Sequence, residues 1–141
     1  MTREELKRDL LGYRALKREH DQLVEELRRV ESTLTSPRSP QYDGMPHSPG
    51  GGGDALLGMV SKHIELQRLY CSQIDTLSAE QLRLERLIAL APDAEDRVLL
   101  RVRYIDGLEW EDICVRLCYS RRSVHYHCNK ALDSIVAQIS E

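Results

Sequence analysis

The strongest constraint on this sequence is the spacing of apolar side chains near its start. Between residues 3 and 34, apolar or helix-compatible residues recur in steps of three or four, close to a heptad repeat. These residues are Leu6, Leu10, Tyr13, Leu16, His20, Leu23, Leu27, Val30 and Leu34. Eight acidic and eight basic residues fill the other faces of the segment. The pattern therefore predicts one long amphipathic helix, which needs a partner to cover its apolar stripe.

A segment rich in proline and glycine, residues 35–54, follows this first predicted helix. Proline and glycine at this density interrupt both helices and strands, so the segment predicts a flexible linker. A linker of this kind could let the flanking helices fold back antiparallel.

Helical spacing returns from about Ala55 to Leu90. Pro92 is expected to end this second long helix, because the residue before a proline avoids the helical region. Its stripe comprises Leu56, Met59, His63, Leu66, Tyr70, Ile74, Leu77, Gln81, Leu84 and Ile88. The spacing leaves open whether the two long helices pair within one chain or between chains. We expect them to hold together a homo-oligomer, most simply a dimer, since lone helices are marginal in water.

The pattern changes to three shorter helices over the last fifty residues. Asp93 is placed to cap the first of them, and Gly107 is expected to stop it. The second is predicted from Glu109 to Leu117, and Ser120 is a good N-cap for the third. The side chains expected on the buried faces are Val98, Leu99, Val102, Tyr104, Ile105, Trp110, Ile113, Leu117, Val124, Cys128, Ala131, Leu132, Ile135 and Ile139. The chain thus divides into a first helix (1–34), a linker (35–54), a second helix (55–91) and a C-terminal domain (92–141).

The segment from Trp110 to Val124 has the layout of a helix-turn-helix. A small residue, Cys114, stands where the two helices would cross, and a short turn at Cys118 and Tyr119 precedes the next helix. Close crossing lets the second helix project into a DNA major groove. Glycine is common at the position of Cys118, where a left-handed conformation would cost about 1 kcal/mol.

Polar side chains of the third helix fall on its outward face if Val124 points inward. The predicted DNA-binding residues are Ser120, Arg121, Arg122, His125, Tyr126, Asn129 and Lys130. Arginine can pair with guanine and asparagine with adenine, whereas hydroxyl groups, lysine and a helix N-terminus suit phosphates. The pattern therefore predicts that this helix binds duplex DNA.

Composition limits the other classes of function. The chain has 141 residues, of which 30% are charged and 5% aromatic, and its formal net charge is -3. That charge argues against a generally basic coat for nucleic acid, but a regulator needs only a local positive face. The charged, helix-forming start does not resemble a targeting segment, and no apolar run is long enough to span a membrane. We therefore expect a cytoplasmic protein with reduced thiols.

A zinc site and an enzymatic active site are the two alternatives to DNA binding. The cysteine and histidine side chains that could assemble a zinc site are Cys114, Cys118, His125, His127 and Cys128. No CxxC pair exists, however, and Cys114 and Cys128 stand where the helices need small buried side chains. His127 is interpreted as a packing residue. We therefore expect no metal or other cofactor. We also expect no enzymatic activity, because neither a phosphate-binding loop nor a nucleophile–base pair is present.

A family resemblance supports the DNA-binding interpretation. The segment from Arg97 to Val124 resembles region 4 of bacterial sigma factors, which reads promoters. The whole chain resembles phage and prophage transcriptional activators of the RinA and ArpU type, which share its two helices, its C-terminal module and a linker phrase like Ser39–Pro46. The resemblance implies an activator of phage late or packaging genes that acts on double-stranded DNA, with host RNA polymerase as a possible partner.

The sequence thus predicts an all-α protein with a long helical hairpin or coiled coil and a C-terminal helix-turn-helix domain. Its expected function is sequence-specific DNA-binding transcription regulation. Two alternatives remain open at this point. One is a small terminase-like packaging subunit, although its usual order places DNA binding first. The other is a polymerase-binding adaptor that does not contact DNA.

Overall fold

The computed structural model describes residues 1–35 and 51–141. Its elements are α1 (Arg3–Thr35), α2 (Gly51–Ile88), α3 (Ala94–Leu100), the π-helical turn η1 (Arg101–Ile105), α4 (Trp110–Leu117) and α5 (Arg121–Ile139). No strand occurs among the described residues, so the predicted all-α class is confirmed. The linker phrase Ser39–Pro46 lies outside the described residues. The second helix begins at Gly51, four residues before the predicted start, although glycine is a poor helix former.

The chain forms two compact units, and both contain parts of α1 and α2. The core unit consists of Met1–Arg18 and Thr76–Glu141, and the hairpin unit consists of Glu19–Asp75. The structure therefore groups the start of α1 and the end of α2 with the C-terminal helices, which the predicted boundaries kept apart.

The core unit is built around side chains from both ends of the chain. Leu6 and Leu10 of α1 are fully buried, as are Leu84 of α2 and Leu132 of α5. Seventeen buried residues from α1, α2 and the C-terminal helices form this one cluster. A bidentate pair, in which Arg83 donates to the Asp9 carboxylate at 2.7 and 2.9 Å, joins α2 to α1 at its edge. The first turns of α1 are thus part of the domain core.

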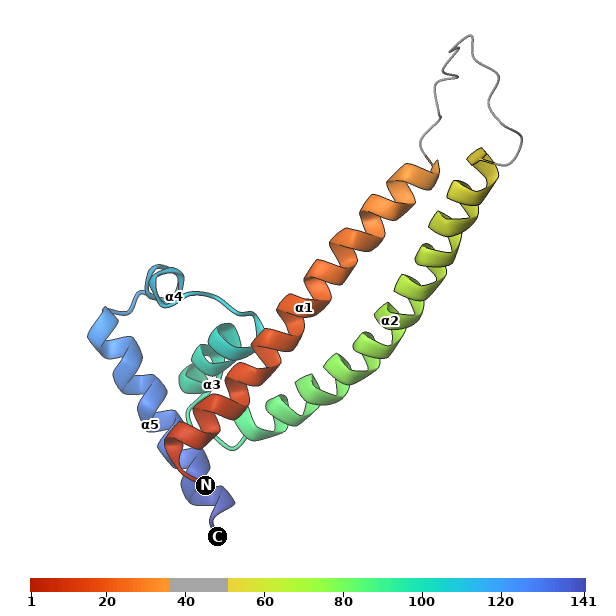
Figure 1. Ribbon diagram of the computed structural model, residues 1–141. Coiled ribbons are helices and arrows are strands. Elements are labelled where there is room, and N and C mark those ends of the chain that lie inside the picture. Colours follow the sequence, from red (N-terminus) through yellow and green to blue (C-terminus); the bar gives the residue numbers. More distant parts are fainter. Residues whose placement is uncertain (36–50) are drawn as a thin grey trace. The chain divides into compact units, whose positions relative to one another are not determined.

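The hairpin unit contains antiparallel segments of α1 and α2. His20 lies 3.0 Å from the Gln73 side chain, and further along α1 the Glu31 carboxylate lies 3.1 Å from His63. A higher number in α1 meets a lower number in α2, so the helices pair antiparallel within one chain, as Figure 1 shows. Burial in this unit is sparse. Val30 is its one buried hydrophobic side chain among the described residues.

The predicted stripes are confirmed for α1 and only in part for α2. Every residue of the α1 stripe is buried or half-buried. On α2 the exposed members are Leu56, Ile74 and Gln81. Leu56 and Ile74 are five full turns apart, so both lie at the same edge of the stripe, away from its half-buried members.

The first C-terminal helix differs from the prediction in its winding and its inward face. It consists of α3 followed by the π-helical turn η1, and it ends before Gly107, whose φ of 77° suits glycine. Val98 was predicted to be buried, but it is 48% exposed. Asp96 and Leu100 occupy the inward side of α3, and Val98 lies on the opposite side.

The remaining C-terminal elements follow the predicted order. Ile113 is fully buried in α4, whereas Trp110 and Leu117 are half-buried against the core. The α5 residues Val124, Cys128, Ala131, Leu132 and Ile135 are buried as predicted. Ile139 is 39% exposed, contrary to the prediction, because it lies one turn beyond the edge of the core. No helix among the described residues is long and apolar enough to cross a membrane.

Candidate nucleic-acid interface

The turn between α4 and α5 is set by one left-handed residue. Cys118 ends α4 with φ 58° and ψ 38°, the conformation that the sequence predicted to be costly but tolerable. The next amide, of Tyr119, donates to the Cys114 carbonyl at 3.1 Å and closes the end of α4. Cys114 itself is half-buried and packs against the core. These residues turn the chain sharply, so that α5 starts within a few residues of the end of α4.

Ser120 begins α5 in the way that the sequence predicted. Its backbone is extended, and its Oγ accepts a hydrogen bond from the Ser123 amide at 3.1 Å. The cap leaves other amides of the first turn without intrahelical partners, as at every helix N-terminus. Such amides, together with the positive end of the helix dipole, favour anions.

Two adjacent arginines follow the cap and project from the surface. Arg121 lies 3.9 Å from the Glu111 carboxylate, and both side chains are more than 70% exposed. Arg122 is also exposed, and no ion-pair partner for it occurs among the described residues. An ion pair this exposed contributes little, so either guanidinium is available to a ligand. The start of α5 therefore presents two exposed arginines, one of them beside Glu111, on a chain of net negative charge.

His125 and Tyr126 are both exposed, but the His125 ring is held by a contact with α4 and the Tyr126 ring is not. The His125 ring lies against Trp110, with centroids 4.5 Å apart. The guanidinium of Arg103 lies 4.3 Å from the Trp110 ring centroid, which adds a cationic contact to this aromatic pair. Tyr126 is 65% exposed, and its one ring contact among the described residues is a T-shaped contact with the neighbouring His127. Tyr126 is thus presented freely, whereas His125 is oriented by α4.

Asn129 and Lys130 lie further along α5 and are less free than predicted. Asn129 is half-buried. Lys130 donates to the Asp93 carboxylate at 3.1 Å, and this hydrogen bond raises the pKa of the ammonium group. Asp93 stands at the N-cap of α3 but makes no capping hydrogen bond with its side chain, contrary to the prediction. A phosphate contact by Lys130 would compete with its ion pair to Asp93.

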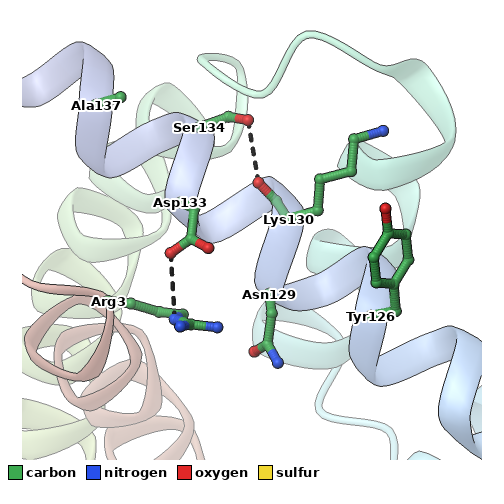
Figure 2. A pocket seen from close by; sticks show the side chains of 7 residues that line it. All are labelled: Arg3, Tyr126, Asn129, Lys130, Asp133, Ser134 and Ala137. Atoms are coloured by element: carbon green, nitrogen blue, oxygen red, sulfur yellow. Dashed lines mark hydrogen bonds and ion pairs between the residues drawn. The ribbon is translucent and has the colours of Figure 1, made fainter.

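Arg3, at the other end of the chain, belongs to the same surface and was missed by the sequence interpretation. Its Nε lies 3.2 Å from the Asp133 carboxylate of α5. Arg3, Tyr126 and Asn129 help to line a groove of about 620 Å³. Figure 2 shows Arg3 reaching from α1 to Asp133, with Asn129 and Tyr126 nearer the start of α5. Asp133 is the one acidic residue of α5. Arg3 and Asp133 are 130 positions apart, so no local sequence pattern could have paired them. The one hint in the sequence was an acidic residue, Asp133, on a helix predicted to bind DNA.

A buried polar contact joins α3 to α5 beneath this surface. Asp96 is only 3% exposed, and its carboxylate lies 3.4 Å from Nδ1 of His127, without hydrogen-bond geometry. The Tyr119 ring stacks on His127 with centroids 5.2 Å apart. His127 is therefore a half-buried packing residue, as predicted, that connects α3, the turn and α5.

The loop before α4 is held by α1. Arg14 donates to the Gly107 carbonyl at 3.2 Å and also forms an ion pair with Glu109. Lys17 donates to the Ile105 carbonyl at 3.2 Å. The loop that leads into α4 is thus held by the middle of α1.

The cysteine and histidine residues are not gathered into a metal site in the described part of the chain. No group of three or more metal-ligating side chains occurs there. Cys128 is buried, its Sγ lies 3.9 Å from the Tyr104 hydroxyl, and burial raises the pKa of its thiol. Cys118 is exposed in the turn. The packing role predicted for Cys128 agrees with its position in the core.

Comparison with known proteins adds no relative to these observations. No family model matches the chain, and neither a curated protein nor a solved structure matches it. The functional interpretation therefore depends on the residues and on their geometry.

Proposed function

We propose that this protein is a DNA-binding transcription regulator, rather than an enzyme, and that it inserts the start of α5 into the major groove of duplex DNA. The observation that carries the proposal is the pair Arg121 and Arg122. They are exposed directly after a capped helix start that follows a tight turn. Arginine side chains at this position of a projecting helix are suited to guanine edges and to phosphates.

The other predicted residues have different roles in this proposal. Tyr126 and Asn129 supply further groups for base edges or sugars along α5. Ser120 and the free amides of the first turn bind a phosphate. His125 takes part with its ring held against Trp110, which limits its reach. Lys130 exchanges Asp93 for a phosphate, at little cost because both side chains are about half exposed.

The direction of regulation is proposed from the sequence alone. The resemblance to phage activators of the RinA and ArpU type supports activation of phage late or packaging genes. An activator of this type would act in the bacterial cytoplasm, together with host RNA polymerase.

Selection from a random duplex library tests DNA recognition without assuming an operator sequence. The wild-type protein is expected to enrich a defined sequence, whereas a polymerase-binding adaptor would enrich none. On the enriched duplex, Arg122→Ala should cost about 1–3 kcal/mol of binding free energy if it reads a base. The double variant Arg121→Ala/Arg122→Ala should also flatten the salt dependence of binding, because fewer counterions are released.

The chain offers a matched control for this double variant. Arg28 and Arg29 are also adjacent arginines at the surface of a helix, but they lie in the hairpin unit. Replacing both with alanine removes the same charge and should leave affinity nearly unchanged. If both double variants lost the same affinity for DNA, the loss would be an effect of net charge. That result would contradict the proposal that α5 is the DNA-binding helix.

A further inference from the structure

Three arginines surround one carboxylate at the N-terminal end of α4. The carboxylate is that of Glu109, which directly precedes the helix. Arg14 of α1 forms a close ion pair with it, and Arg18 of α1 and Arg103 of η1 each lie 3.8 Å from it. Among the described residues, Glu109 is the one carboxylate within ion-pair distance of these arginines. The four residues, named here the basic cluster, therefore carry an excess of positive charge.

The inner side of the basic cluster holds positive charge that Glu109 does not fully neutralise. The side chains of Arg14 and Arg103 are only 12% and 11% exposed. Arg103 donates to the Leu108 carbonyl at 3.0 Å, but its buried Nε has no hydrogen-bond partner among the described residues. Burial lowers the pKa of the Arg103 guanidinium, and the positive charge of Arg14 lowers it further. A second anion beside the cluster would therefore be attracted.

Arg18 and Glu109 form the outer side of the basic cluster. Their side chains are 68% and 63% exposed. The distance of 3.8 Å between them is too long for a hydrogen bond, and an ion pair this exposed contributes little. The Arg18 guanidinium can therefore turn to an external anion at little cost. A guanidinium is well suited to a phosphate, because it can donate two parallel hydrogen bonds.

The basic cluster is continuous with the proposed DNA-binding surface of α5. The Trp110 ring contacts both, since its centroid lies 4.3 Å from the Arg103 guanidinium and 4.5 Å from the centroid of the His125 ring. Glu111, in the first turn of α4, lies 3.9 Å from Arg121 of α5. All of these residues belong to the core unit. The major groove of DNA is about 12 Å wide, so phosphates at its edge pass close beside a helix that enters it.

We propose that the basic cluster binds a backbone phosphate of the same duplex whose major groove α5 enters, and that Arg18 makes the contact. Arg14 and Arg103 stay buried behind Arg18 and contribute positive charge, whereas Glu109 opposes the binding. The inference rests on the proposed function and adds α1 to a surface that the sequence interpretation assigned to α5. The contact carries no base information, because every base pair is flanked by the same phosphates.

Binding of the full-length protein to two duplexes tests the inference. One is the duplex enriched from the random library, and the other has an unrelated sequence. Arg18→Ala should weaken binding to both by the same factor, on the order of eight in about 0.1 M salt, because a phosphate contact releases about 0.9 of a counterion. The salt slope should also fall by about 1. Arg28→Ala, at an exposed arginine of α1 in the hairpin unit, is the matched control and should change neither quantity.

A charge change of the opposite sign gives a second measurement. Glu109→Gln removes the opposing charge but keeps an oxygen atom for Arg14, so binding to both duplexes should become several-fold tighter. Glu25→Gln is its control, because Glu25 is exposed and lies 3.8 Å from Arg29 in the hairpin unit. The thermal midpoint of each variant, followed by circular dichroism, should equal that of the wild type. If Glu109→Gln lowers the midpoint, the result for Arg18→Ala decides.

The outcomes separate this inference from the proposed function. Full affinity in Arg18→Ala, or an equal loss in Arg28→Ala, would overturn the inference. A loss confined to the enriched duplex would also overturn it, because Arg18 would then read a base. If the double variant of Arg121 and Arg122 still lost affinity in these cases, α5 would remain the DNA-binding helix. A wild type that binds neither duplex would overturn the proposed function and this inference together.

Discussion

The core unit and the hairpin unit are built from the same two long helices but bury them to different degrees. In the core unit, α1 and α2 meet α3, α4 and α5, and seventeen side chains are buried in one cluster. In the hairpin unit the same helices meet only each other, and Val30 is the buried hydrophobic side chain among the residues described there.

This difference teaches that a continuous heptad-like stripe does not imply uniform burial. A stripe shows which side of a helix can pack, but the depth of burial depends on how many neighbours reach that side. The candidate DNA-binding residues all lie in the core unit, where the helices have more neighbours.

The largest expected effect is on the free energy of unfolding, when the same substitution is made at two positions of the α1 stripe. Leu10 is fully buried in the core unit, whereas Leu27 is half-buried in the hairpin unit. Leu10→Ala should lower the free energy of unfolding by about 2–5 kcal/mol, because it leaves a cavity. Leu27→Ala should cost about 1 kcal/mol, because less apolar surface is lost and water can enter. Urea unfolding followed by circular dichroism measures both, and equal costs would remove the distinction between the units.

A smaller effect is expected at the turn before α5. Cys118 has φ 58°, so Cys118→Gly should stabilise the core unit by about 1 kcal/mol by removing the clash of a side chain in the left-handed region. Cys118→Ala keeps a Cβ atom and should not stabilise. Hydrogen exchange should slow in α4 and α5 and stay unchanged in the hairpin unit. A gain shared by both variants would assign the effect to the thiol instead of the backbone.

The smallest effect concerns Arg3 and the one acidic residue of α5. Arg3→Ala should weaken DNA binding up to about fivefold, because it leaves Asp133 unneutralised next to the phosphates; exposed ion pairs have this magnitude. In an Asp133→Asn background the same change should have no effect. Arg8→Ala, at another exposed arginine of α1, is the control.

The outcome in the double variant decides how Arg3 acts. A loss that persists with Asp133→Asn would mean that Arg3 binds DNA directly and does not act through Asp133.

Local features of the sequence were sufficient for the helices and for the turn. The two long helices, the stop at Gly107 and the cap by Ser120 all follow from side-chain spacing and from backbone preferences of single residues. The exposure of Arg121 and Arg122 was predictable for the same reason, because an inward Val124 determines which neighbours face outward. These are short-range properties, determined by the helix repeat and by the preferences of single residues.

Tertiary structure decided which partners those side chains meet. Lys130 pairs with Asp93 instead of remaining free, His125 lies on Trp110, and Arg3 reaches Asp133 from the opposite end of the chain. It also decided that the α1 stripe is deeply buried at Leu10 and only half-buried at Leu27. Periodicity reports the orientation of a residue about its own helix axis, whereas contacts between distant segments depend on where the folded chain brings those helices together.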